Sequence, residues 1–217
     1  MDTNIILHRY KEFVDHHINS DDALYLVRMM FELTYQWFER YIAAYYHITQ
    51  KYYTKAIWCL TDWWIDIEWS KIEWHKEINL LAQCKKWTHD HIQKKEILNF
   101  DYDAKHSKKN KLNTKHLFVT TTRANKDARK VAKEYWIEII DCHELLKFRN
   151  KYSLDDFIKK YGRDKYKKRT YRTRFFKNIN VIKIIEDYRK NKLFWKKQYP
   201  KLNTSDYLFV KSFSYNK

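Results

Sequence analysis

The sequence predicts an α/β fold, because β-prone segments alternate with helical ones along the middle of the chain. Two β-prone segments, 64–69 and 77–84, are separated by a polar connection, which is typical of an antiparallel hairpin. A strand at 116–121, a helix at 125–135 and a strand at 136–140 then follow. A strand–helix–strand unit of this length predicts a parallel pair of strands.

The chain divides into three predicted parts. Residues 1–34 are a helical segment, in which Ser20, Asp21 and Asp22 are typical of a helix start. Residues 35–148 form the α/β part, and residues 149–217 form a basic, mainly helical extension. Further helices are expected at 35–48, 90–99, 141–148 and 180–192, and Asp141 is the expected N-cap of the third. A strand is expected at 52–60 and a lysine-rich loop at 105–111. The C-terminus is expected to be an extended segment, to which the sequence assigns no role.

The charge balance predicts a polyanionic partner. Lys and Arg total 44 against 27 Asp and Glu, a net charge of +17, which favours nucleic acid or an anionic membrane surface. No run of about 18 apolar residues exists, so no membrane span and no signal peptide are expected. Three cysteines without CxxC spacing fit a reducing compartment, so we expect a cytoplasmic protein.

One stretch combines an acid, an amide and a lysine. Residues i and i+2 of a strand share a face, so Gln83 and Lys85 point the same way, and a hairpin brings Asp66 beside them. These three groups are suited to holding a divalent metal against a phosphodiester.

The order of motifs resembles the Mrr-like branch of the PD-(D/E)XK nucleases. Phe38-Glu39, the segment from Asp62 to Ile67 and Leu81-Ala82-Gln83-Cys84-Lys85 carry the resemblance, together with the later segments 117–122 and 137–145, so that it covers about residues 37–147. It implies a restriction-endonuclease-like core, with a mixed central sheet flanked by helices, that cuts DNA with Mg²⁺.

The resemblance also implies roles for individual residues. Asp66 is similar to the metal-binding aspartate, and Gln83 matches the glutamine that replaces the usual acid as a metal ligand. Lys85 matches the lysine that orients or activates water and offsets phosphate charge. Glu39 is similar to the helix glutamate that often completes the site, and Asp62 is an auxiliary acid.

The C-terminal extension contains the predicted nucleic-acid contacts. Cationic side chains alternate there with Tyr and Phe, a composition that suits phosphate contacts and base stacking. The cations are Arg163, Lys165, Lys167, Lys168, Arg169, Arg172 and Arg174. The alternative is a small helical subdomain with a solvated basic face.

Tryptophan stands where the family usually has glycine. Trp63 and Trp64 occupy a Gly-Gly turn before Asp66, and Trp136 lies at a natural left-handed cap. The chain has one glycine and nine tryptophans, whereas average usage predicts about fifteen glycines. We therefore hypothesise that the gene uses UGA for glycine and that this codon has been translated as tryptophan. Trp58, Trp69 and Trp74 also stand where glycine would be unremarkable, and UGG codons at 63, 64 and 136 would contradict the hypothesis.

Two alternatives to a restriction or defence endonuclease stay open. Genuine tryptophans at 63 and 64 favour a catalytically degenerate, DNA-binding nuclease fold, and a junction-resolving or repair nuclease has the same core. Cutting both strands would imply a homodimer, by symmetry with the duplex. The histidines near Cys84 lack the spacing of a structural zinc site, and a phosphate-binding glycine-rich loop is absent, which disfavours a zinc enzyme and an NTPase.

Overall fold

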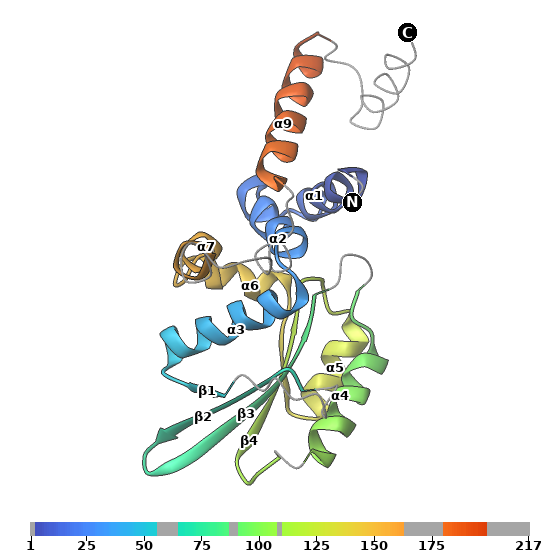
Figure 1. Cartoon of the computed structure of the whole chain (residues 1–217). Coiled ribbons are helices and arrows are strands. Elements are labelled where there is room, and N and C mark those ends of the chain that lie inside the picture. Colours follow the sequence, from blue (N-terminus) through green and yellow to red (C-terminus); the bar gives the residue numbers. More distant parts are fainter. Residues whose placement is uncertain (1–2, 56–64, 87–90, 108–109, 163–179, 199–217) are drawn as a thin grey trace.

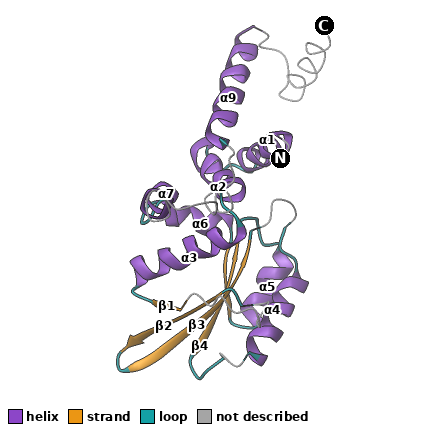
Figure 2. Ribbon diagram, in the orientation of Figure 1, coloured by secondary structure: helices purple, strands orange, loops and turns teal. Residues whose placement is uncertain are grey.

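A five-stranded sheet is the centre of the structure, which is a computed structural model (Figure 1). It describes residues 3–55, 65–86, 91–107, 110–162 and 180–198. The strands lie in the order β1-β2-β3-β4-β5, which is also their order along the chain. Figure 2 shows helices on both sides of the sheet.

The sheet is mixed. Strands β1 (Tyr53–Lys55), β2 (Ile67–Glu73) and β3 (Lys76–Lys85) pair antiparallel, whereas β4 (Thr114–Thr120) and β5 (Ile137–Ile140) extend the sheet with parallel pairs. The predicted hairpin and the predicted parallel pair are therefore confirmed. Strand β3 lies at the junction of the two arrangements, so its backbone is hydrogen-bonded on both sides.

Two apolar cores lie on opposite faces of the sheet. Helices α4 (Lys94–His106) and α5 (Lys126–Glu134) connect the parallel strands and pack with Phe118 and Ile137 on one face. The other face, with Trp69 among its buried residues, packs against α3 (Tyr35–Gln50) and α6 (Cys142–Arg149). Helices α4 and α5 lie on one side of the sheet in Figure 1, as expected when consecutive parallel crossovers have the same hand.

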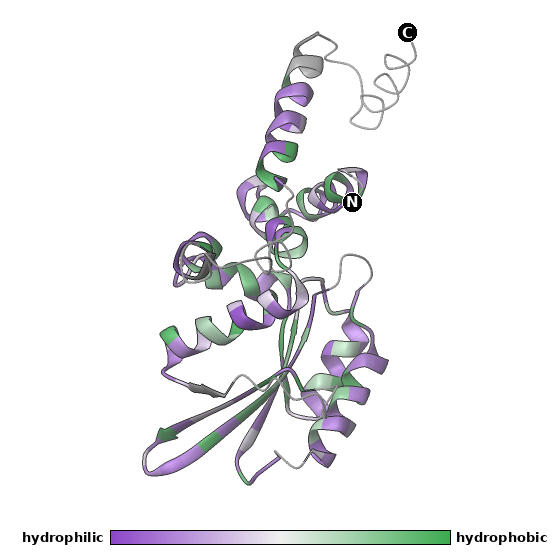
Figure 3. Cartoon of the chain, in the orientation of Figure 1, coloured by the Kyte–Doolittle hydropathy of each residue, from purple (hydrophilic) through white to green (hydrophobic). Residues whose placement is uncertain are grey.

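The N-terminal helices also contact the C-terminal part of the chain. Helices α1 (Thr3–Asp15) and α2 (Ser20–Glu32) contact α9 (Val181–Gln198). Its Arg189 donates to the Tyr10 hydroxyl at 2.9 Å. The base of α9 is apolar where Val181 and Ile185 are buried, and the helix becomes more hydrophilic farther along (Figure 3).

Helix α7 (Leu154–Gly162) is fixed to α2 by a bidentate ion pair. The two terminal nitrogens of the Arg28 guanidinium donate to the two oxygens of Asp155, at 3.0 and 2.8 Å. The apolar core that includes α3 continues without interruption from Ile6 to Ile185. It therefore contains residues of all three predicted parts, and the three-part division of the chain stays a prediction.

Several predicted boundaries were wrong. Helix α1 ends at Asp15, and Asn19 caps a new helix by accepting from the backbone N–H groups of Asp21 and Asp22. The predicted start at Ser20 is confirmed. Strand β2 begins at Ile67 and runs to Glu73, so the connection of the hairpin is only Trp74 and His75.

Other differences concern the polar segments. Helix α4 begins at Lys94 and continues to His106, so the start of the predicted lysine-rich loop is helical. Of the predicted strand at 52–60, the structure describes Tyr53–Lys55 as β1, and positions 56–64 lie outside the described residues. In the described ranges, no helix combines the length and the apolar character needed to cross a bilayer.

The buried carboxylate of Asp141 organises the end of the sheet, and its removal should destabilise the protein. It caps α6 by accepting from the backbone N–H of His143 at 3.0 Å, accepts from that of Ala124 at 3.3 Å, and pairs with Arg129. Replacing Asp141 by Ala leaves these donors without their acceptor, which should cost about 3 kcal/mol of unfolding free energy in urea titrations. The exposed control Glu134→Ala should change it by less than about 0.5 kcal/mol, and equal effects of the two changes would contradict this role.

Candidate active site

The site forms where β2 begins and β3 ends. Ile67 is the first residue of β2 and pairs with Ala82, and the backbone N–H of the preceding Asp66 donates to the carbonyl of the same Ala82. Gln83 and Lys85 are two residues apart in β3 and share a face of the sheet. The start of β2 therefore lies beside the end of β3, and the grouping of Asp66, Gln83 and Lys85 as one site stays a prediction.

The Asp66 carboxylate is bound to the backbone of β3. Its Oδ2 atom accepts the Cys84 backbone N–H at 2.6 Å, while the Asp66 backbone N–H donates to the Ala82 carbonyl at 2.9 Å. A side-chain oxygen thus occupies a position where a regular ladder would supply a carbonyl. This contact fixes the carboxylate beside the end of β3.

Asp66 is harder to ionise than a solvated aspartate. Burial raises the pKa of Asp66 to about 6, although the hydrogen bond from Cys84 and the charge of Lys85 act in the opposite direction. The influence of Lys85 places its ammonium group within electrostatic reach of the carboxylate.

Glu39 approaches the same point from helix α3. The pKa of Glu39 is raised to about 7, first by burial and then by the negative charge of Asp66, while Arg40 acts to lower it. The structure thus brings a helix glutamate close to the aspartate that precedes β2, although 27 positions separate them in the sequence. Two partly buried acids that repel each other are suited to share either a proton or a cation.

The remaining groups of the site differ in exposure. Gln83 is almost fully buried, with 3% of its surface exposed, whereas Lys85 is partly exposed at the end of the strand. Burial, followed by the charges of Asp66 and Glu39, raises the pKa of the Cys84 thiol. Cys84 therefore stays protonated near neutral pH and is not suited to act as a nucleophile.

The donor set fits a hard divalent cation. Two carboxylates and the side-chain oxygen of an amide are the oxygen ligands that Mg²⁺ prefers, and Mg²⁺ keeps several waters, so few protein ligands suffice. Within the described residues, no group of three or more His, Cys, Asp or Glu side chains could hold a metal. Gln83 alternates with Ala82 and Cys84, which are buried in the core that includes α3, so one ligand set of Gln83 with Glu39 and Asp66 stays a prediction.

Lys86 was missed from the sequence. Its side chain is 1% exposed, donates from Nζ to the Met30 carbonyl at 2.7 Å and lies 4.9 Å from the centroid of the Tyr35 ring. It therefore connects the end of β3 to the last turn of α2, where a cation also complements the helix dipole. The sequence signal that could have predicted a buried lysine is the pair of consecutive lysines at the end of the strand, because alternation directs one of them to each face of the sheet.

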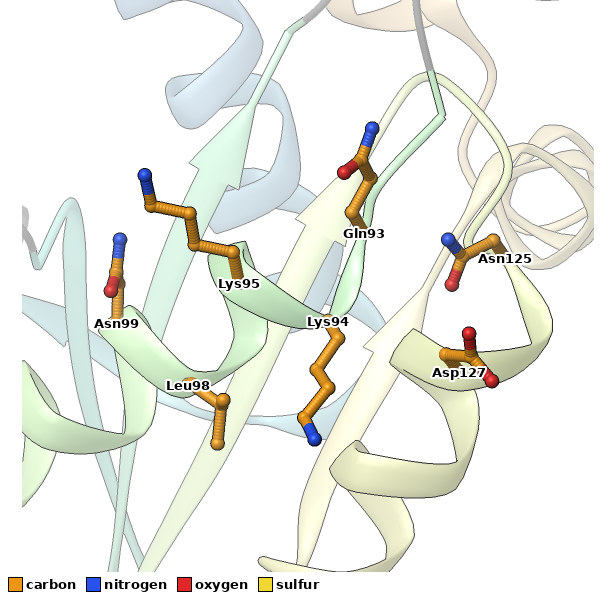
Figure 4. A pocket seen from close by; sticks show the side chains of 7 residues that line it. All are labelled: Gln93, Lys94, Lys95, Leu98, Asn99, Asn125 and Asp127. Atoms are coloured by element: carbon orange, nitrogen blue, oxygen red, sulfur yellow. The ribbon is translucent and has the colours of Figure 1, made fainter.

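A separate cleft lies between the beginnings of α4 and α5. It has a volume of about 390 Å³ and is open to solvent. Figure 4 shows its lining side chains, which are Gln93, Lys94, Lys95, Leu98, Asn99, Asn125 and Asp127. None of the four candidate catalytic residues is among them, so the cleft and the acidic pair are separate features.

Two groups of predicted residues lie outside the described part of the chain. They are Asp62, Trp63 and Trp64, which precede Asp66 in the sequence, and the basic residues from Arg163 to Arg174. Their predicted roles stay predictions.

The raised pKa values of the two acids predict how stability depends on pH. Both groups bind protons more tightly in the folded state than in the unfolded chain, so folding stability should fall as pH rises from about 4 to about 7 in the absence of metal. Replacing Glu39 by Gln removes one of these titrations, so the melting temperature should rise relative to wild type at pH 8 and stay close to it at pH 4.

The control for this measurement is Glu134→Gln, on the exposed surface of α5. It should leave the pH profile of the melting temperature unchanged. A difference between Glu39→Gln and wild type that is the same at pH 4 and pH 8 would argue against the raised pKa.

Comparison with known proteins places these observations in a family. The chain matches the family model Mrr_cat, described as restriction endonuclease, over residues 32–148, which is more than half of its length. Among solved structures it is similar to restriction endonuclease FokI, with a TM-score of 0.43 and 11% identity over 72% of this chain. The chain spans about a third of the FokI chain (33%), and none of the curated proteins matches it.

Proposed function

Because the chain belongs to the Mrr_cat restriction endonuclease family, we propose that it is a Mg²⁺-dependent DNA endonuclease of the restriction or defence type. The observation that carries this proposal is the pair of electrostatically coupled acids, Glu39 and Asp66, beside Lys85 at the end of β3. Family membership supports nuclease chemistry, and the acidic pair supports a cation-dependent form of it.

Each residue of the site has a proposed role. Asp66, Gln83 and Glu39 would hold the cation through oxygen atoms. Such an ion lowers the pKa of a bound water and stabilises negative charge on the phosphate. Lys85 contributes a compact positive charge that offsets the developing charge of the phosphate and orients the attacking water. The Cys84 N–H keeps Asp66 in place by donating to its carboxylate.

The acidic pair also makes cation binding dependent on pH. A proton and a divalent cation compete for Glu39 and Asp66, whose pKa values are about 7 and about 6. Raising the pH through this range frees the two carboxylates for the cation, so cleavage at limiting Mg²⁺ should increase between pH 6 and pH 8.

The predicted DNA contacts and location are part of the proposal. The charge of +17 and the basic residues 163–174 support DNA as the partner. Cys84 and Cys142 are free thiols in the described part of the chain, which suits a reducing cytoplasm. A homodimer would allow both strands to be cut.

Two other functions have specific support. Trp63 and Trp64 in the sequence favour a catalytically inactive DNA-binding protein, which would bind DNA in a salt-sensitive manner without cutting it. A junction-resolving or repair nuclease would use the same site. Comparing branched with linear duplexes in Mg²⁺ and Mn²⁺ separates the three functions.

Removing the proposed ligands should abolish cleavage and preserve binding. Asp66→Asn retains the shape of the side chain but loses its charge, and Lys85→Ala removes the ammonium group. Each change should lower Mg²⁺-dependent cleavage by at least about 10²–10³-fold, whereas the dissociation constant for DNA measured in Ca²⁺ should change little. The exposed controls Glu134→Gln and Lys130→Ala should cut at the wild-type rate, and cleavage unaffected by both active-site changes would refute the assignment.

The basic segment should set the salt dependence of DNA binding. Replacing Arg169, Arg172 and Arg174 by Ala should reduce the slope of log K against log[salt] by roughly 0.9 for each lost phosphate contact, about three in total. The matched control with Lys at these positions keeps the charge and should keep most of the slope. An unchanged slope in the Ala variant would place the phosphate contacts elsewhere.

A further inference from the structure

Two exposed tryptophans occupy backbone conformations that favour glycine. Among the described residues, six other than glycine have positive φ, and Trp74 and Trp136 are two of them, with φ of 51° and 58°. In this region the Cβ atom of an L-residue crowds the following carbonyl, which costs free energy. Glycine has no Cβ and avoids that cost.

Neither indole gains burial in exchange for this cost. Trp74 is 89% exposed and Trp136 is 90% exposed. An exposed side chain gains little from the hydrophobic effect, which depends on apolar area removed from water. The backbone conformation at both positions therefore disfavours tryptophan, and the exposed side chain adds no stabilisation that would offset this.

The local geometry requires left-handed backbone at both positions. Trp74 and His75 are the two loop residues of the β2–β3 hairpin and both have positive φ, as in a type I′ turn, which favours Asn, Asp or Gly at its first position and Gly at its second. Trp136 directly follows Tyr135, the C-cap of α5, and donates its N–H to the Lys133 carbonyl at 3.4 Å. That position after a helix is the one where glycine is most enriched.

Two other tryptophans provide an internal comparison. Trp69 is fully buried in β2, with its ring centroid 5.0 Å from that of Tyr46, and Trp37 is buried in α3, 5.4 Å from the ring of Phe157. Both have negative φ. Both positions bury the indole, although Nε1 of Trp69 has no hydrogen-bond partner among the described residues. Residue 69 lies within β2, where glycine weakens a strand, so the expectation that glycine would be unremarkable there was wrong.

We propose that the host of this gene reads UGA as glycine, and that positions 74 and 136 are glycine in the protein it makes. The composition supports the same inference, because the chain has one glycine where average usage predicts about fifteen. Trp37 and Trp69 are encoded by UGG and are genuine. The inference concerns the chemical identity of two turn residues and is independent of the proposed nuclease activity.

The first test combines the codons with peptide masses. Sequencing the gene should give UGA at 74 and 136 and UGG at 37 and 69, and mass spectrometry of the protein purified from its own host should find glycine in the peptides that cover 74 and 136. UGG at either turn, or tryptophan in those peptides, would overturn the proposal. UGA at both 37 and 69 would also overturn it, because the codon would then not follow the backbone conformation.

The second test uses the chain with tryptophan, made in a standard host. Trp136→Gly and Trp136→Ala both remove the indole, but only glycine relieves the Cβ contact. The glycine variant should therefore melt roughly 2–4 °C above the alanine variant, and position 74 should behave in the same way. At the buried position 69 the order should reverse, since glycine weakens a strand. Alanine variants that match or exceed glycine at both turns would contradict the proposal.

Discussion

The hydrogen bond from the Cys84 backbone to the Asp66 carboxylate is the contact on which the candidate site depends. It holds an acid where β2 begins, and the acid cannot leave without exposing an unpaired N–H near the core. Packing of α3 against the same sheet then brings Glu39 close to it. The two acids repel each other, and the packing of the surrounding apolar core keeps them close. A flexible loop could not hold them at this separation.

Strand alternation correctly predicted which residues of β3 share a face of the sheet. Leu80, Ala82 and Cys84 are buried in the core that includes α3, so the residues between them must face the other way, and the sequence pattern states this directly. The parallel unit was equally readable, because strand, helix and strand follow one another within 25 residues, from 116 to 140. These predictions succeeded because, in a strand or a helix, the position of one residue determines the direction of its neighbours in the sequence.

Contacts between distant elements were not predictable in this way. The proximity of Glu39 to Asp66 depends on how α3 crosses the sheet, and no local pattern encodes that angle; the family resemblance supplied it instead. The contact of Lys86 with the Met30 carbonyl was missed for the same reason, since 56 positions separate the two residues.

Helix α2 fixes both ends of the segment that contains the basic residues. Asp155 of α7, before the segment, pairs with Arg28 of α2, and Arg189 of α9, after it, pairs with Asp21 at the start of the same helix. The two ion pairs therefore hold α7 and α9, which are far apart in the sequence, against the same helix.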